Sequence, residues 1–190
     1  MNLAARWRYP LARFLLFINM EEQAVAQLRE ALRMDPTLVA AHETLAFLYA
    51  ARGGNALAVE AFQNALTLAP DHAATWFNLG FVYHTQHAHE EAVTAFKHAL
   101  ALSANIDRAW YGMGLAQRSL GQLNEATASL KEAGRLQPMN PYAFYELGMT
   151  YYALKQYDKV QEMIDYLNGF DPKMTMQLMR DTPERRSGAP

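Results

Sequence analysis

The stretch AATWFNLGFVYHTQHAHEEAVTAFKHALALSAN, residues 73–105, carries two apolar stripes separated by a polar turn. The first stripe has the i, i+3, i+4, i+7 spacing of one helix face and consists of Trp76, Leu79, Gly80 and Tyr83. A second helix is predicted to begin near Glu90, because acidic residues favour a helix N-terminus. Its apolar face consists of Ala92, Phe96, Ala99 and Leu100. Two short helices cannot bury all of this surface against each other, so we expect the hairpin to stack on copies of itself.

Such copies are present, because the pattern recurs every 34 residues without an insertion. The small residue of the first helix recurs as Ala12, Ala46, Gly80, Gly114 and Gly148. The second helix repeats a small residue as Ala24, Ala58, Ala92, Ala126 and the larger Val160, followed by Leu28, Phe62, Phe96, Leu130 and Ile164. Small residues let two helices cross closely, and the large residue fills the space between them. Prolines that end the second helices stand at Pro36, Pro70, Pro138 and Pro172, whereas the equivalent Ala104 lacks the ring.

A 34-residue hairpin with these residues at these positions resembles the tetratricopeptide repeat family, and the resemblance covers about residues 5–172. It implies an all-α, right-handed α-solenoid of about five helix-turn-helix repeats within residues 1–172. The expected repeats are 5–38, 39–72, 73–106, 107–140 and 141–172. The first repeat is expected to be degenerate, because Arg8 replaces a large apolar residue and Pro10 lies inside the predicted helix. Gln117 also departs from the pattern, since it stands where other repeats have tyrosine.

Both ends of the chain differ from the repeats. Residues 173–181 are expected to form a C-terminal capping helix, and residues 182–190 a disordered tail, because they lack apolar periodicity. The N-terminal segment combines arginines with aromatic residues, but its apolar run is too short to span a bilayer and no signal-peptide cleavage site follows. Burial against the next repeat is the favoured interpretation, and attachment to a membrane interface is the alternative.

The resemblance also implies an interaction surface, because the first helices of this family line a concave groove. The residues that the repeat pattern places there are mostly aromatic or apolar, with Asn78, Arg108 and Arg118 as candidate polar anchors. The complete set is Phe47, Phe77, Asn78, Phe81, Arg108, Tyr111, Leu115, Arg118, Tyr142, Tyr145, Met149 and Tyr152. Packing already uses another face of these helices, so a helix that is apolar on two faces is expected to bury the second face against a partner.

One specialised version of that groove is a clamp for a peptide C-terminal carboxylate, built from Lys, Asn and Arg. Asn78 and Arg108 match two of its positions, but Glu43, Phe47 and Gly112 do not. Glu43 would repel a carboxylate. The sequence therefore argues against this clamp.

Other function classes find little support in the composition. A net charge of −2 gives no basic surface for a nucleic acid, and the absence of cysteine removes thiolate metal sites and disulfides. His84, His87 and His89 form the one histidine cluster, but they fall at a helix end and a turn without a complete ligand set. The sequence contains no phosphate-binding loop and no nucleophile motif. No catalysis, cofactor or metal is expected.

Two functions remain compatible with the sequence. The first is a non-catalytic scaffold or adaptor that holds a peptide or helix of another protein in an aromatic groove. The second is a structural protein that assembles with copies of itself, with an accessory subunit of an enzyme or membrane complex as a further variant. The expected location is cytoplasmic, with peripheral membrane association as the alternative.

Overall fold

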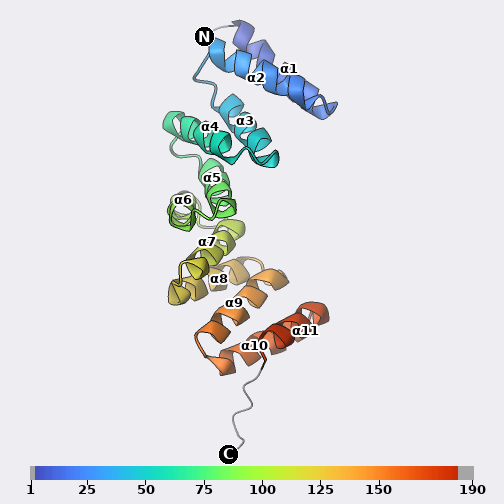
Figure 1. Cartoon of the computed structure of the whole chain (residues 1–190), viewed down its shortest axis with the longest axis vertical. Coiled ribbons are helices and arrows are strands. Elements are labelled where there is room, and N and C mark those ends of the chain that lie inside the picture. The colour runs from blue at the N-terminus through green and yellow to red at the C-terminus, as the bar shows by residue number, and fades with distance from the viewer. Residues whose placement is uncertain (1–2, 184–190) are drawn as a thin grey trace, which may run out of the picture. The chain divides into compact units, whose positions relative to one another are not determined.

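The computed structural model describes residues 3–183, with side chains described from Trp7 onward. These residues form helices and no strand (Figure 1). The helices are α1 Leu3–Phe17, α2 Glu21–Met34, α3 Val39–Ala51, α4 Asn55–Leu68, α5 Ala73–Thr85, α6 His89–Leu102, α7 Asp107–Ser119, α8 Leu123–Leu136, α9 Pro141–Ala153, α10 Tyr157–Asn168 and α11 Pro172–Asp181. Helices α3, α5, α7 and α9 begin 34 residues apart, as do the five even-numbered helices from α2 to α10. The all-α repeat architecture predicted from the sequence is thereby confirmed.

The turn inside each hairpin contains one residue with a left-handed backbone. The five positions are Asn19, Gly53, His87, Gly121 and Lys155, with φ between 58° and 74°. They lie 34 residues apart, so the same turn geometry is repeated with different residues. Glycine adopts this conformation without strain and asparagine and histidine tolerate it, whereas lysine does so at a cost.

The loops between repeats also share a side-chain hydrogen bond, which the sequence pattern did not predict. A backbone carbonyl at the same position of each loop accepts a side-chain hydrogen bond. The pairs are His42 Nε2 to Pro36 O at 2.9 Å, Trp76 Nε1 to Pro70 O at 2.8 Å, Trp110 Nε1 to Ala104 O at 2.8 Å and Tyr166 OH to Pro138 O at 3.1 Å. Because the carbonyl and not the ring makes this bond, Ala104 serves as well as proline.

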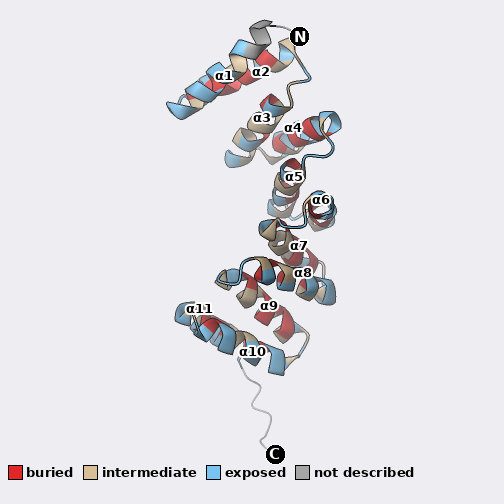
Figure 2. Cartoon of the chain, turned by 180° about the vertical axis from the view of Figure 1, so that it is seen from behind, coloured by how far each residue is buried: buried red, intermediate tan, exposed pale blue. Residues whose placement is uncertain are grey.

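The chain divides into two compact units, residues 1–87 and residues 88–190. In the first unit, α1, α2 and α3 share a core that includes Ala12, Leu28 and Leu45. In the second unit, Leu130, Leu147, Tyr151 and Val160 form a core between α8, α9 and α10. Figure 2 shows the buried residues along the facing sides of the helices within each unit.

The first hairpin keeps its packing despite its irregular sequence. Pro10 lies within α1, and Ala12 is fully buried against α2. Arg8, which replaces a large apolar residue, donates from Nη1 to Gln27 Oε1 of α2 at 2.7 Å. The face of α1 that meets α2 is therefore packed. The expected burial of the segment's aromatic residues against the next repeat is not observed, because Trp7, Phe14 and Phe17 are exposed.

The C-terminal helix α11 begins at Pro172, with Asp171 Oδ1 accepting a capping hydrogen bond from the Met174 amide at 2.9 Å. It packs on α9, because a Cβ at Gly148 would lie 2.7 Å from Cδ2 of the fully buried Leu178. The ordered chain extends beyond the predicted start of the tail at residue 182: Thr182 is buried and donates to Leu178 O at 2.6 Å. Residues 184–190 of the predicted tail lie outside the described residues.

Candidate functional site

The predicted groove residues all belong to the odd-numbered helices. In the first unit, Phe47 is on α3, and Phe77, Asn78 and Phe81 are on α5. The other eight are on α7 and α9 in the second unit: Arg108, Tyr111, Leu115, Arg118, Tyr142, Tyr145, Met149 and Tyr152. None of the twelve is buried. Two of them, Tyr111 and Tyr152, nevertheless pack against the core of the second unit.

The first unit exposes two large rings on neighbouring odd-numbered helices. Phe47 is 51% exposed and Phe81 is 56% exposed, whereas Leu45 and Leu79, two residues earlier on the same helices, are almost fully buried. The exposed Phe47 ring rests edge-on against the buried Phe62 ring, with centroids 5.5 Å apart. Its orientation is thus fixed while half of its surface stays accessible to a partner.

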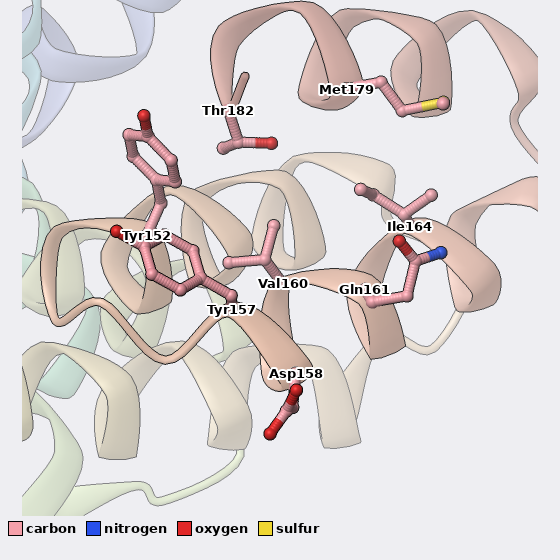
Figure 3. A pocket seen from close by; sticks show the side chains of 8 residues that line it. All are labelled: Tyr152, Tyr157, Asp158, Val160, Gln161, Ile164, Met179 and Thr182. Atoms are coloured by element: carbon pink, nitrogen blue, oxygen red, sulfur yellow. The ribbon is translucent and has the colours of Figure 1, made fainter. Parts of the chain in front are cut away.

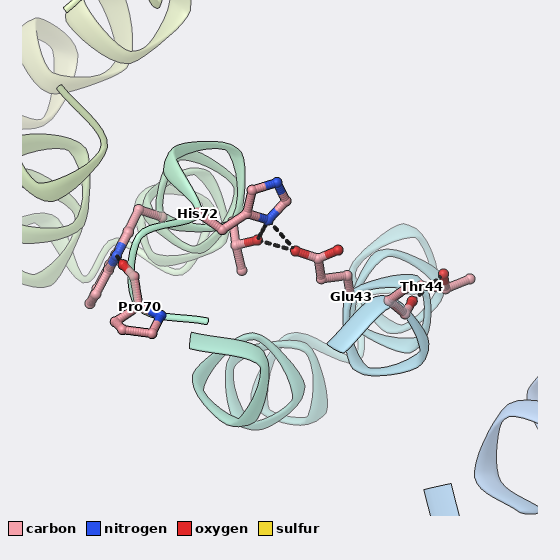
Figure 4. Close-up of polar contacts among 7 residues, drawn as sticks. Glu43, Thr44, Pro70 and His72 are labelled. Carbon is pink, nitrogen blue, oxygen red and sulfur yellow. Dashed lines mark hydrogen bonds and ion pairs between the residues drawn. The ribbon is translucent and has the colours of Figure 1, made fainter. Parts of the chain in front are cut away.

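The acidic residue of this face, Glu43, is already engaged within the unit (Figure 4). His72 Nδ1 lies 2.5 Å from Glu43 Oε1, and the Thr75 hydroxyl donates to the same carboxylate oxygen. These contacts connect α3 to the start of α5. From the sequence, Glu43 is expected to repel an incoming carboxylate, but in the structure its charge is partly satisfied by these donors.

The three residues His72, Thr75 and Glu43 do not form a nucleophilic triad. Such a triad places the imidazole between its partners, with one ring nitrogen facing the hydroxyl and the other facing the carboxylate. Here Nδ1 faces both Glu43 Oε1 and Thr75 Oγ1, the latter at 2.7 Å. Thr75 is also only 2% exposed. The cluster holds two helices together and presents no attacking group to a substrate.

In the second unit, an ion pair joins the first helices of two successive repeats. Arg118 Nη1 on α7 lies 2.7 Å from Glu146 Oε2 on α9. Glu146 is largely buried and Arg118 is about one third exposed. The predicted anchor Arg118 therefore has a partner within its own chain and helps to fix α7 against α9.

Tyr111 shares the environment of this ion pair. Burial, reinforced by the negative charge of Glu146, raises the pKa of Tyr111 to about 12. Burial likewise raises the pKa of Glu146, with Arg118 opposing the shift. Tyr111 also packs against the core cluster of the second unit, so its ring is held in place, and its raised pKa keeps the hydroxyl protonated.

The C-terminal segment covers part of the predicted surface on α9. The Tyr145 hydroxyl donates to Asp181 Oδ2 at 2.8 Å, and the Tyr152 hydroxyl donates to Pro183 O at 3.3 Å. The hydrogen bond from Tyr145 lowers the pKa of Asp181, so this contact favours the ionised carboxylate. Two of the predicted groove tyrosines thus have partners in α11 and the residues after it.

A pocket of about 340 Å³ opens beside this contact (Figure 3). It lies between α9, α10 and α11 and is lined by Tyr152, Tyr157, Asp158, Val160, Gln161, Ile164, Met179 and Thr182. The Tyr152 and Tyr157 rings meet edge to face with centroids 5.9 Å apart. The aromatic and aliphatic side chains of this lining suit an apolar side chain of a partner.

Three residues of these faces were missed by the sequence reasoning. Glu146 could have been found, because it occupies the same repeat position as Asn78. The repeat pattern could not point to His72 or Asp181, since His72 lies before helix α5 and Asp181 lies outside the repeats.

Two further classes of site are absent from the described part of the chain. No three histidine or acidic side chains there come close enough together to hold a metal ion. None of the helices in that part is long and apolar enough to cross a membrane.

Comparison with protein families gives two matches. A family model described as tetratricopeptide repeat matches residues 36–105, and one described as TPR repeat matches residues 114–155. Together they cover more than half of the chain. Comparison with curated protein sequences found no significant match.

Solved structures with the same fold cover nearly the whole chain. YrrB, described as a TPR protein with an unusual peptide-binding site, has a TM-score of 0.83 at 23% identity, covering 91% of this chain and 90% of its own. MamA from Desulfovibrio magneticus RS-1 has a TM-score of 0.80 at 21% identity, with 97% and 99% covered. PilW, a type IV pilus biogenesis factor, has a TM-score of 0.74 at 25% identity, with 95% and 87% covered.

Proposed function

Because this chain belongs to the tetratricopeptide repeat family, we propose that it is a non-catalytic scaffold whose odd-numbered helices hold a peptide or helix of another protein. The observation that carries the proposal is the exposure of large apolar side chains on two odd-numbered helices whose packing faces are already buried. Phe47 and Phe81 represent this surface in the first unit. In the second unit, the partly exposed Leu115 and Met149 lie at the corresponding positions of α7 and α9.

The chemistry of these side chains suits a protein segment better than a small polar ligand. Aromatic rings offer a large rigid area at low entropic cost, and they are enriched among the residues that dominate interface energies. Phe47 is oriented by Phe62, and Tyr111 by the core of the second unit. Such preorganisation lowers the ordering cost of binding.

The polar anchors have different roles in this proposal. Asn78 is partly exposed and Arg108 is exposed, so both side chains can contact polar groups of the partner. Arg118 is a positioning residue, because its guanidinium pairs with Glu146. We therefore assign binding energy chiefly to apolar contacts, with Asn78 and Arg108 setting direction.

YrrB, which has the same fold, is described as having a peptide-binding site. A peptide is therefore a reasonable first probe for this chain. The test is selection of a random peptide library, displayed on phage, against the immobilised chain. Enrichment of peptides with aliphatic or aromatic anchors is the expected result. Enrichment of purely charged peptides, or of none, would contradict the proposal.

Light scattering over a range of protein concentrations separates this function from self-assembly. A constant mass is expected for a scaffold that binds other proteins. A mass that grows with concentration, and falls when Phe81 is replaced by serine, would show that copies of the chain occupy the surface instead.

A further inference from the structure

Helix α1 exposes an apolar stripe that the packing of the first hairpin does not use. Trp7, Leu11, Phe14 and Ile18 recur at i, i+4, i+7 and i+11 and are 74%, 45%, 56% and 41% exposed. Phe17, beside them, is 84% exposed. Figure 2 shows exposed positions, in pale blue, on α1. Among the described residues, no helix covers this stripe.

The repeat pattern indicates what kind of surface could cover it. Trp7, Leu11 and Phe14 occupy the positions that, in later repeats, pack on the preceding hairpin. The residues equivalent to Trp7 are all small and nearly fully buried: Ala41, Thr75, Ala109 and Ala143. A tryptophan at this position prevents the close helix approach that those small residues permit. A second copy that stacks as the repeats do would therefore fit poorly.

The charge around the stripe favours an anionic surface. Residues 1–20 contain three arginines and no acidic residue, whereas the rest of the chain has 14 basic and 19 acidic residues, a net charge of −5. Arg13 is exposed on α1. Ion pairs partly offset the acidic residues of the adjoining helix α2: Glu21 and Glu22 share Arg52, each at 2.7 Å, and Glu30 lies 2.8 Å from Arg33 and 4.0 Å from Arg8.

We propose that α1 is an interfacial helix that docks the chain on an anionic lipid bilayer, with its Trp and Phe side chains inserted among the headgroups. At 15 residues, α1 is about 22 Å long, shorter than the roughly 30 Å hydrocarbon core, so it lies along the surface. An apolar face with aromatic residues and a basic charge is the pattern of such helices. The surfaces on α3 to α9 would stay available to a protein partner.

Sedimentation of the full chain with vesicles tests this inference. Vesicles of phosphatidylcholine with about one third phosphatidylserine are compared with vesicles of phosphatidylcholine alone. We expect binding to the anionic vesicles that weakens as salt is raised. Arg13→Gln should weaken this binding about fivefold and leave binding to neutral vesicles unchanged, since one basic side chain near an anionic surface contributes about 1 kcal/mol.

The apolar contribution is tested with Phe14→Ser, which should weaken vesicle binding about tenfold because one ring no longer inserts. The matched control is Phe81→Ser, since Phe81 has the same 56% exposure but lies on α5. It should leave vesicle binding unchanged while impairing peptide binding. Failure of the lipid inference is therefore distinguishable from failure of the proposed scaffold function.

Thermal melting of both variants should match the parent, because both rings are exposed. Equal vesicle binding by the parent and Phe14→Ser, or no binding to anionic vesicles at low salt, would overturn the inference. So would a dimer of the parent that Phe14→Ser dissociates while neither protein binds vesicles, which would assign α1 to a second copy.

Discussion

Lys155 adopts a backbone conformation that lysine disfavours. Its φ of 58° places it at the turn position that glycine occupies in two other hairpins. Left-handed backbone costs a residue with a Cβ about 1–2 kcal/mol, partly offset by the extra entropy that glycine has in the unfolded chain. We expect Lys155→Gly to raise the free energy of unfolding by about 0.5–1 kcal/mol, measured by urea denaturation.

The reverse change at the equivalent turn is its control. Gly121 has a φ of 74°, and no atom lies within 4 Å of the place that a Cβ would take, so Gly121→Ala introduces backbone strain without a clash. It should lower stability by about 1 kcal/mol. Stabilisation by Gly121→Ala, or a loss of stability in Lys155→Gly, would show that these turns are not strained as described.

Helices α7 and α8 approach closely at Gly114. A Cβ there would lie 2.7 Å from Leu130 Cγ, so a larger side chain must push the helices apart. Gly114→Leu is expected to lower the free energy of unfolding by about 1–3 kcal/mol or more. Ala128→Leu, on the exposed face of α8, should change it by less than about 0.5 kcal/mol. Equal melting temperatures for the two variants would refute this contact.

The contribution of the Arg118–Glu146 ion pair to folding stability should depend on pH. Because burial raises the folded-state pKa of Glu146 above its ordinary 4.5, ionising Glu146 disfavours the folded state, and Arg118 offsets this effect. Arg118→Met removes the positive charge that stabilises ionised Glu146, so it should lower the free energy of unfolding by about 1–3 kcal/mol at pH 7. The cost should shrink toward pH 4.5, where the folded variant retains the Glu146 proton.

Urea denaturation of Arg118→Met at pH 7 and pH 4.5 measures this difference. In the double variant Arg118→Met, Glu146→Gln the extra pH dependence should vanish, because no carboxyl remains at that position. A loss of stability that is the same at both pH values would mean that the ion pair does not connect the two helices.

The sequence was sufficient to predict the helices because the 34-residue spacing constrains every hairpin in the same way. It could not predict that Glu43 contacts His72 or that Tyr145 donates a hydrogen bond to Asp181. Those contacts depend on how closely neighbouring helices approach and on side-chain rotamers, neither of which leaves a periodic signal. Trp76 shows the same limit: its packing position followed from the pattern, but its hydrogen bond to Pro70 O did not.

For the candidate surface, the repeat pattern predicted side chains that face away from the core. None of the twelve is buried, although Tyr111 and Tyr152 pack against the core of the second unit. The pattern did not predict that Arg118, Tyr145 and Tyr152 have partners within the chain. That these twelve residues bind a partner stays a prediction, as do the cytoplasmic location and the repeat boundaries. Both units carry apolar side chains on this surface, so the prediction can be tested in each unit separately.

The affinity of a library-selected peptide for variants of the whole chain tests the scaffold function most directly. Phe81→Ala in the first unit and Leu115→Ala in the second are compared with Leu57→Ala and Leu102→Ala, which shorten exposed leucines on the even-numbered helices α4 and α6. Fluorescence anisotropy should show a loss of roughly thirtyfold, about 2 kcal/mol, for at least one of the first pair. Neither control should change the affinity by more than about twofold. Unchanged affinity in Phe81→Ala and Leu115→Ala together with a loss in either control would place binding on the even-numbered helices and contradict the account.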